Sequence, residues 1–508
     1  MGTAQIVRGA LHSIKVALSI IQYAEEIEHT SWSERAKFCM ATLTFQGAVG
    51  EVTGSRYLIE LNDTEPSHKL LLECGLHQGG PDAERVNARP FGALARQLSA
   101  VVLSHGHLDH AGLLPKLVRE GYRGPIHCPW DTRDLLEIML ADAAFVMAKD
   151  IEWENKWRTK ADKPLLEVLY DLDDVERTLK LCEPHGYGQP VSLPGGATLV
   201  FRDAGHILGS SIVELGLPSG GRQRRLVFSG DLGNPSSVLM KEPEKIHEAD
   251  VVMMESTYGD RDHRPLEETI EEFSQVLEEA HDAGGNVLIP AFAVGRTQEI
   301  LYHLSVLYHE GRLKQQRIFL DSPMAIRVTE LYARKRKSLN REDLKVLNVA
   351  AQGDPSQYLP VLRLTRSVEE SMAINRIHGG AIVIAGAGMC NGGRILHHFR
   401  YNLAKPSTRV VIVGFQAAGT LGRQLVDGAE RVKVLGDELP VKAKIHTIGG
   451  FSAHAGQSHL VGWAGAFRHR PQFYLVHGEP SAQKALQTAL AESGIEADIP
   501  GYGDCVSL

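Results

Sequence analysis

The chain has 508 residues with 43% hydrophobic side chains, enough for two or three globular domains or for one domain with a large insertion. Its formal net charge of -8 at pH 7 argues against a protein that coats nucleic acid non-specifically, although a local basic groove stays compatible with that charge. The six cysteines contain no CxxC pair, so we expect reduced thiols and a cytoplasmic location.

The first 39 residues precede the strand-like sequence that begins near Met40. Within them, residues 11–23 hold an apolar run that polar side chains interrupt and that is too short to span a bilayer. We therefore predict a helical N-terminal extension and no membrane partner. A genuine appendage and an upstream start codon both remain open for this segment.

Short apolar and alternating runs at 42–45, 57–61 and 69–72 predict a hairpin or meander of strands with glycine turns between them. Glu73 closes the third of these strands. Such a carboxylate either orients a metal-binding histidine through its free ring nitrogen or ends the strand in solvent, and the residues alone leave both open.

The densest motif is Ser-His-Gly-His-Leu-Asp-His at 104–110, which follows a predicted buried strand and precedes a helix. Four of its side chains can bind a metal: His105, His107, Asp109 and His110. Such crowding is costly unless a cation neutralises and orders the groups, and loops at strand ends are common ligand positions. The motif therefore favours a metal site over a polar loop that is rich in histidine by chance.

Residues 130–183 repeat apolar side chains at three- and four-residue spacing and are predicted to be helical, with Trp153 and Trp157 packed in a core or between helices. Three later strand-like runs each end at a polar residue: 198–201 before His206, 225–228 before Asp231 and 250–254 before Glu255. Several strands that offer acids or histidines at one edge predict a layered α/β sheet with a site along that edge.

From about 265 to 435 strands and helices alternate and glycine-rich loops join them, which predicts a second domain with a parallel sheet. Amides at such helix N-termini suit phosphate, and arginines at three of the junctions would add charge-assisted hydrogen bonds: Arg296, Arg394 and Arg423. Surface salt bridges are the alternative role for each arginine. Neither GxGxxG with a following acid nor GxxxxGK[ST] is present, so the motifs do not support dinucleotide or ATP binding.

Two more histidines at strand ends, His454 and His477, follow this region and match the pattern of residues 100–255. The first domain is therefore predicted to be discontinuous, with the second inserted into it. The predicted boundaries are 1–39 for the extension, 40–260 and 435–508 for the two parts of the first domain, and 261–434 for the insertion.

The pattern His105-x-His107-x-Asp109-His110, with His206, Asp231 and His477, is similar to the ligand set of the metallo-β-lactamase fold. Glu255-Ser-Thr-Tyr-Gly, Phe-Ser-Ala-His454 and Val-His477-Gly-Glu resemble motifs A, B and C of its β-CASP branch. That branch contains the RNA 3′-end cleavage endonuclease and many bacterial and archaeal ribonucleases. The resemblance runs from Thr42 to Glu479, with one departure at Glu73, where many relatives carry Asp. It implies a metallo-β-lactamase αββα sandwich with an inserted α/β β-CASP domain.

The resemblance also implies two zinc ions that share Asp231, one held by His105, His107 and His206 and the other by Asp109, His110 and His477. Imidazole and carboxylate ligands without cysteine suit zinc. Two such ions hold a hydroxide nucleophile and neutralise phosphoryl oxygens during an in-line displacement. The implied catalytic residues are His454, as general acid beside Glu255, together with Asp109 and Asp231. Ser452 joins the three arginines as a predicted phosphate contact.

The implied function is a zinc-dependent ribonuclease that acts on single-stranded RNA, as an endonuclease, a 5′-exonuclease or both. In the family, a histidine at motif C accompanies RNA-acting members, which favours RNA as the partner; a homodimer is considered beside the monomer. Two alternatives are kept. One is a small-molecule hydrolase of the same fold, acting on a lactam, thioester or lactone, and the other is a non-catalytic scaffold that holds RNA.

Overall fold

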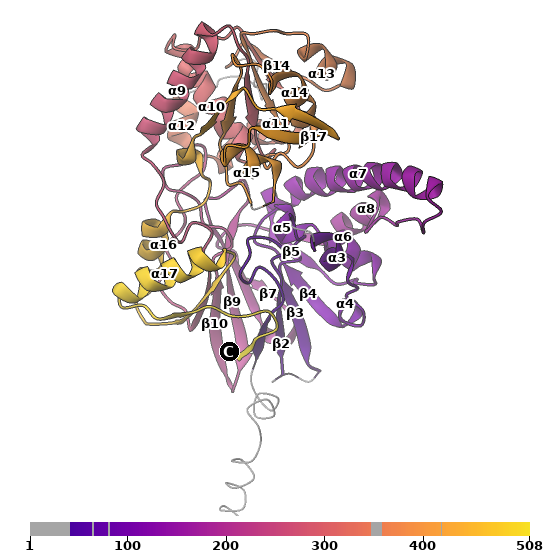
Figure 1. Cartoon of the computed structure of the whole chain (residues 1–508). Helices are drawn as coiled ribbons and strands as arrows, with labels where there is room; N and C mark the ends of the chain where they lie inside the picture. Colours follow the sequence, from indigo (N-terminus) through magenta and orange to yellow (C-terminus); the bar gives the residue numbers. More distant parts are fainter. Residues whose placement is uncertain (1–40, 63, 65, 80–81, 347–357, 418) are drawn as a thin grey trace, which may run out of the picture.

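The computed structural model describes residues 41–508 except 63, 65, 80–81, 347–357 and 418. The predicted N-terminal extension, residues 1–39, lies outside the described residues. Figure 1 shows two lobes, one built on a pair of sheets and the other on a third sheet, with helix α7 (Trp130–Lys160) projecting beside their junction. Among the described residues, no helix has the length and apolar character that a bilayer crossing requires.

Two seven-stranded sheets pack together in the first lobe. The first has the order β22-β1-β2-β3-β4-β5-β6 and the second the order β21-β20-β11-β10-β9-β8-β7. Alternating residues of both sheets, such as Leu43 and Ile59 on one side and Phe201 and Leu215 on the other, form one buried core between them. The strands of the first sheet are β1 (Thr42–Phe45), β2 (Tyr57–Leu61), β3 (His68–Leu72), β4 (Leu98–Val102), β5 (Ile126–Pro129), β6 (Cys182–His185) and β22 (Cys505–Ser507), and those of the second are β7 (Val191–Ser192), β8 (Thr198–Asp203), β9 (Ser211–Ser219), β10 (Arg222–Phe228), β11 (Val251–Glu255), β20 (Gln472–Val476) and β21 (Ala497–Asp498).

Helices cover the outer face of each sheet and complete the predicted αββα sandwich. A separate apolar cluster joins each helical layer to its sheet. The helices over the first sheet are α3 (Ala83–Ala88), α4 (Leu94–Gln97), α5 (Leu108–Ala111), α6 (Leu114–Arg119), α7 and α8 (Leu172–Leu181), and those over the second are α16 (Gln457–Ala464) and α17 (Pro480–Glu492).

The second lobe is built on a six-stranded sheet of order β14-β13-β15-β12-β16-β19, in which all the paired strands are parallel. Because helices pack on both faces, the central strand β15 is buried at all five positions. Its strands are β12 (Val287–Pro290), β13 (Arg317–Leu320), β14 (Leu362–Leu364), β15 (Ala381–Ala385), β16 (Arg409–Ile412) and β19 (Lys444–Thr447), and its helices include α9 (Leu266–Asp282), α10 (Arg296–His309), α11 (Pro323–Arg334), α12 (Arg341–Val346), α13 (Val368–Ile374), α14 (Arg394–Asn402) and α15 (Leu421–Val426).

The chain returns to the first lobe after β19, later than the predicted boundary at 434. That boundary falls at the turn of a hairpin between β17 (Arg431–Val434) and β18 (Asp437–Pro440). After the hairpin, β19 still pairs with β16. The inserted parallel sheet therefore takes its last strand from the returning chain, ten residues after the position where the sequence changes character.

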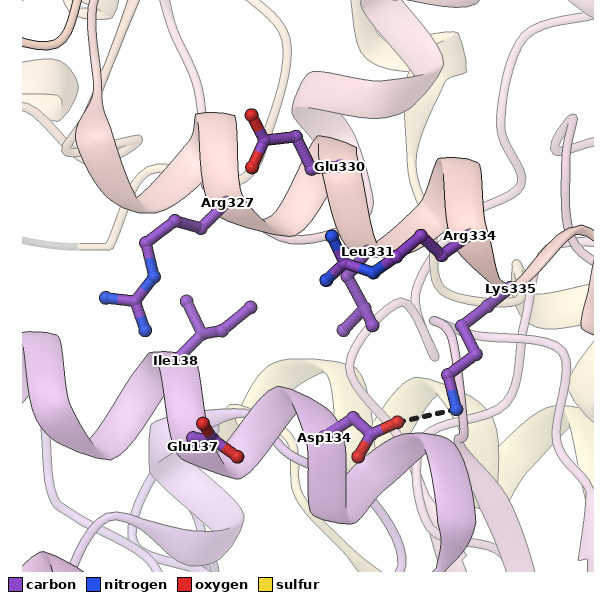
Figure 2. Close-up of a pocket in the computed structure, with 8 residues that line it drawn as sticks. All are labelled: Asp134, Glu137, Ile138, Arg327, Glu330, Leu331, Arg334 and Lys335. Carbon is purple, nitrogen blue, oxygen red and sulfur yellow. Dashed lines mark ion pairs between the residues drawn. The ribbon is translucent and has the colours of Figure 1, made fainter. Parts of the chain in front are cut away.

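Helices α7 and α11 join the two lobes. Ile138 of α7 and Leu331 of α11 lie in one apolar cluster, and Lys335 Nζ lies 2.5 Å from Asp134 Oδ2. Beside this contact the two helices line a cavity of about 400 Å³ (Figure 2), which shares no residue with the predicted site.

The expectation that Trp153 and Trp157 are packed is wrong, because these side chains are 72% and 51% exposed. The last buried residue of α7 is Ala144, and beyond it the helix extends past the sheet that it covers (Figure 1). Helical spacing of apolar residues is the same whether or not another layer covers that face, so the sequence does not distinguish the two cases.

Candidate metal and catalytic site

The loops that carry the predicted ligands meet where the two sheets adjoin. His107 precedes the first turn of α5, so Asp109 and His110 lie on that short helix. The backbone amide and the hydroxyl of Ser211 both donate to the carbonyl of Ser104, at 2.9 and 2.8 Å, which ties the second sheet to the loop of the His-x-His motif. Residues far apart in the sequence are thereby brought to one edge.

One cluster contains His105, His107, His206 and Asp231, whose ligand atoms all lie within 4.8 Å of one another. Asp231 Oδ2 lies 3.4 Å from His105 Nε2 and 3.6 Å from His206 Nε2. The other ring nitrogen of His206 faces the carbonyl of Ala453 at 3.2 Å. That contact orients the ring so that Nε2 points into the cluster.

A second cluster contains Asp109, His110 and His477, also with all ligand atoms within 4.8 Å. His477 Nε2 lies 3.5 Å from Asp109 Oδ2 and 3.3 Å from His110 Nε2. The remaining oxygen of Asp231, Oδ1, lies 3.3 Å from His110 Nε2. The two oxygens of Asp231 thus face different clusters, as a residue shared by two cations would.

The chemistry of these groups fits bound cations. His105, His110 and His206 are almost completely buried, and Asp231 Oδ1 has no hydrogen-bond partner among the described residues. Burial lowers the pKa of His105 and of His206 well below its usual value, which leaves neutral rings with free lone pairs. Buried lone pairs that face one another without protons are costly unless a cation lies between them. Imidazole with carboxylate is a donor set that zinc accepts.

Glu73 is completely buried and holds His110, so the alternative of a solvated strand end is wrong. His110 Nδ1 lies 2.5 Å from Glu73 Oε2, and Ser104 donates to Glu73 through its amide at 2.6 Å and through its hydroxyl at 3.0 Å. Burial raises the pKa of Glu73, against the lowering effect of His110. The carboxylate fixes the ring of His110 with Nε2 toward Asp231.

We expect Glu73→Gln to weaken metal binding about 10- to 100-fold, the usual cost of removing a carboxylate that orients a metal-binding histidine. The amide keeps the volume but loses the charge that faces His110 Nδ1. Competition with a chromophoric chelator measures the affinity, and Glu60→Gln, at a partly exposed position of β2, is the matched control. Equal affinities of the Glu73→Gln and Glu60→Gln proteins would contradict the orienting role.

His454 pairs with Glu255 at the same edge. His454 Nδ1 lies 3.3 and 3.2 Å from the two oxygens of Glu255, which is fully buried and also accepts the amide of Leu232 at 2.6 Å. Burial of the ring opposes protonation, but the carboxylates of Glu255, Asp231 and Asp109, with Glu255 foremost, together raise the pKa of His454 to about 9. The ring centroid lies 4.4 Å from that of His206, so a charged imidazole is held beside the first cluster.

The predicted phosphate contacts have different surroundings. Ser452 is buried beside His454, whose amide donates to Ser452 Oγ at 3.3 Å. Each arginine has a carboxylate partner: Arg296 pairs with Glu299, Arg394 with Asp321 at 2.7 Å and Arg423 with Asp427 at 2.9 Å. The structure therefore brings Ser452 to the His454–Glu255 pair, whereas the arginines already have ion-pair partners within the inserted domain.

Residue-by-residue reasoning missed two contacts to the predicted ligands. Thr257 Oγ1 lies 3.0 Å from His477 Nδ1, and Ser104 Oγ lies 3.0 Å from His105 Nδ1 as well as binding Glu73. Both residues belong to motifs that the sequence did single out, at Glu255-Ser-Thr and Ser-His-Gly-His. Ser104 directly precedes His105 and Thr257 follows Glu255 by two residues, and this closeness to predicted site residues was the available signal.

Comparison with known proteins gives three matching family models. Residues 49–186 match the metallo-beta-lactamase superfamily, residues 297–425 the Beta-Casp domain and residues 438–500 the Zn-dependent metallo-hydrolase RNA specificity domain. All three matches lie within residues 41–508.

Similar curated proteins include one named ribonuclease TTHA0252, from Thermus thermophilus, which is 42% identical over 463 residues that cover 91% of this chain and 99% of that protein. Another, from Methanocaldococcus jannaschii, is named transcription termination factor FttA and is 29% identical over 86% of this chain and 67% of its own. A crystal structure of a protein of unknown function from Enterococcus faecalis V583 has a TM-score of 0.50 at 12% identity, over 92% of this chain and 100% of that one. That last likeness supports the fold alone.

Proposed function

The chain belongs to the β-CASP branch of the metallo-β-lactamase superfamily and is a metal-dependent hydrolase of the nuclease type, and from that premise we propose that it is a zinc-dependent ribonuclease that hydrolyses phosphodiester bonds of single-stranded RNA. The observation that carries the proposal is the His454–Glu255 pair beside two metal-capable clusters that share Asp231. The match to an RNA specificity domain over 438–500 and the relative named ribonuclease support RNA as the substrate.

Two zinc ions are assigned to the two clusters, with Asp231 shared between them. When bound, the ions activate water at neutral pH and neutralise charge on the phosphate oxygens. The chain's own part is to fix their positions. Glu73 and the carbonyl of Ala453 hold His110 and His206 in orientation, and Thr257 does the same for His477.

His454 is the proposed general acid. Its side chain is 21% exposed, so a substrate can reach it, while Glu255 is inaccessible. The ring therefore presents one edge to the substrate while Glu255 keeps it charged and oriented. We assign it the proton that the leaving 3′ oxygen needs, and we assign Ser452, beside it, to a phosphate oxygen.

An assay on RNA oligomers tests the proposal. Single-stranded RNA labelled at the 5′ or 3′ end is incubated with the protein, with protein stripped by a chelator and with stripped protein given zinc. We expect cleavage of single-stranded RNA to disappear with the metal and to return with zinc, and the two labels to separate internal cleavage from 5′-exonucleolytic removal.

The same protein samples, assayed on a thioester as well as on RNA, separate the two alternatives. Faster turnover of a thioester than of RNA would favour the small-molecule hydrolase, and RNA binding without metal-dependent cleavage would favour the scaffold. Either result would contradict the proposed function.

A further inference from the structure

Two histidines and a glutamate form another group of metal-capable side chains, on strands that carry none of the ligands assigned above. His127 lies on β5, and Glu183 and His185 lie on the neighbouring edge strand β6. The two strands are parallel and His127 is paired with Glu183, so His185, two residues further on, points to the same face of the sheet. The three ligand atoms lie within 4.8 Å of one another.

The group is buried on one side and open on the other. His127 is 4% exposed, and its Nδ1 lies 2.9 Å from His185 Nε2 and 3.8 Å from Glu183 Oε2. The ring of His185 stacks at 6.3 Å on Phe201 of the second sheet, whereas the side chain of Glu183 is 59% exposed. An ion therefore has an open approach to a preformed pair of rings at the edge of the sandwich.

Both rings are in the form that binds metals. Burial, with a smaller effect of His185, lowers the pKa of His127 to about 4, and burial also lowers the pKa of His185. Neutral imidazoles have a lone pair for a cation, and Glu183 supplies a negative charge.

A simple hydrogen bond between the two rings is the alternative account, since 2.9 Å is an ordinary N–H···N distance. His127 Nε2, which is buried with no hydrogen-bond partner among the described residues, does not separate the two accounts, because the atom that faces His185 and Glu183 is Nδ1. The metal account differs in that it also uses the Glu183 carboxylate, which lies 3.8 Å from His127 Nδ1. Two nitrogens bound to tetrahedral zinc lie about 3.3 Å apart, as follows from Zn–N distances of about 2.0–2.1 Å. The partly exposed His185 needs to shift by only a few tenths of an ångström to reach that separation.

We propose that His127, Glu183 and His185 form a third metal site, which binds a divalent transition-metal ion such as zinc and is separate from the catalytic centre. Strand β5 continues directly into α7, and β6 follows α8 directly. An ion bound by these residues links β5 to the edge strand β6. It thereby connects the two ends of the helical segment 130–181, which lies between these strands in the sequence. It stabilises the layer of the protein that contacts the inserted domain.

The test starts from zinc-loaded protein. Equilibrium dialysis measures the number of zinc ions bound per chain, and the melting temperature is measured at each zinc concentration. We expect the wild type to bind one equivalent more than His185→Ala, and Glu183→Gln to bind that equivalent more weakly. Added zinc should raise the melting temperature of the wild type more than that of His185→Ala. His185 and Glu183 are not fully buried, so both variants should fold.

Cys182→Ser is the matched control, because Cys182 lies on the same strand and its thiol contacts Cys128. It should keep the extra equivalent. Equal zinc binding by the wild type and His185→Ala would overturn the proposal, and so would loss of the extra ion in Cys182→Ser. The difference between the wild type and His185→Ala should persist in an Asp231→Asn background, so the outcome does not depend on the proposed catalytic centre.

Discussion

Replacement of Asp231 by Asn should reduce RNA cleavage by about 10³-fold or more and should weaken binding at both proposed zinc positions. The reason is that Asp231 Oδ2 faces His105 and His206 while Oδ1 faces His110. Metal ions supply several kcal/mol to such reactions, and each 1.36 kcal/mol, approximately, is a factor of ten in rate. Single-turnover rates on labelled RNA and elemental analysis of the same samples measure the two effects.

Asp498→Asn is the matched control for this prediction. Asp498 lies on β21, in the same sheet as β10, the strand that precedes Asp231. It is exposed and accepts a hydrogen bond from Gln472. That variant should keep the wild-type rate and zinc content. An Asp231→Asn protein with both ions retained and a rate within tenfold of the wild type would show that Asp231 is not shared between two metals.

Replacement of His454 by Ala should lower kcat by about 10²- to 10⁴-fold, the usual contribution of a general acid, while both zinc positions stay filled. The ring contacts His206 but is held by Glu255, so its removal leaves the metal-capable groups in place. His459→Ala, at an exposed position of α16, is the control and should behave as the wild type.

A substrate with sulfur in place of the 3′ bridging oxygen separates a general acid from a merely structural group. A leaving thiolate needs no proton, so the His454→Ala protein should cleave this substrate with less than a tenfold deficit. A deficit of the same size on both substrates would contradict the assignment and would indicate that His454 only positions its neighbours.

Much of the fold could be predicted because strands and helices depend on local sequence, whereas the complete ligand set was implied by a family resemblance and stays a prediction. The first three strands occur where alternation places them, and the His-x-His-x-Asp-His motif spans the end of one loop and the short helix α5. The partners of these residues depend on tertiary register and could not be predicted in the same way. The residues around Glu73 left open whether it orients a histidine or ends the strand in solvent, and only the fold shows that it is buried against His110. Nothing local indicates that the oxygens of Asp231 face two clusters.

The surroundings of the arginines also depend on tertiary contacts that the sequence does not reveal. Glycine-rich junctions and positive charge at Arg394 and Arg423 suggested phosphate contacts, yet both guanidinium groups have carboxylate partners. Asp321, which pairs with Arg394, is 73 residues away in the sequence, so only the fold reveals the pairing. Whether a charged side chain already has a partner depends on tertiary contacts, and composition does not report that; the phosphate contacts of the arginines stay predictions.

Anomalous diffraction at the zinc edge from crystals of the zinc-loaded protein tests the central claim most directly. The account predicts two strong peaks on either side of Asp231, one beside His105 and His206 and the other beside His110 and His477. Crystals of active protein with no peak at Asp231, or with a single peak that leaves one cluster without metal, would contradict it.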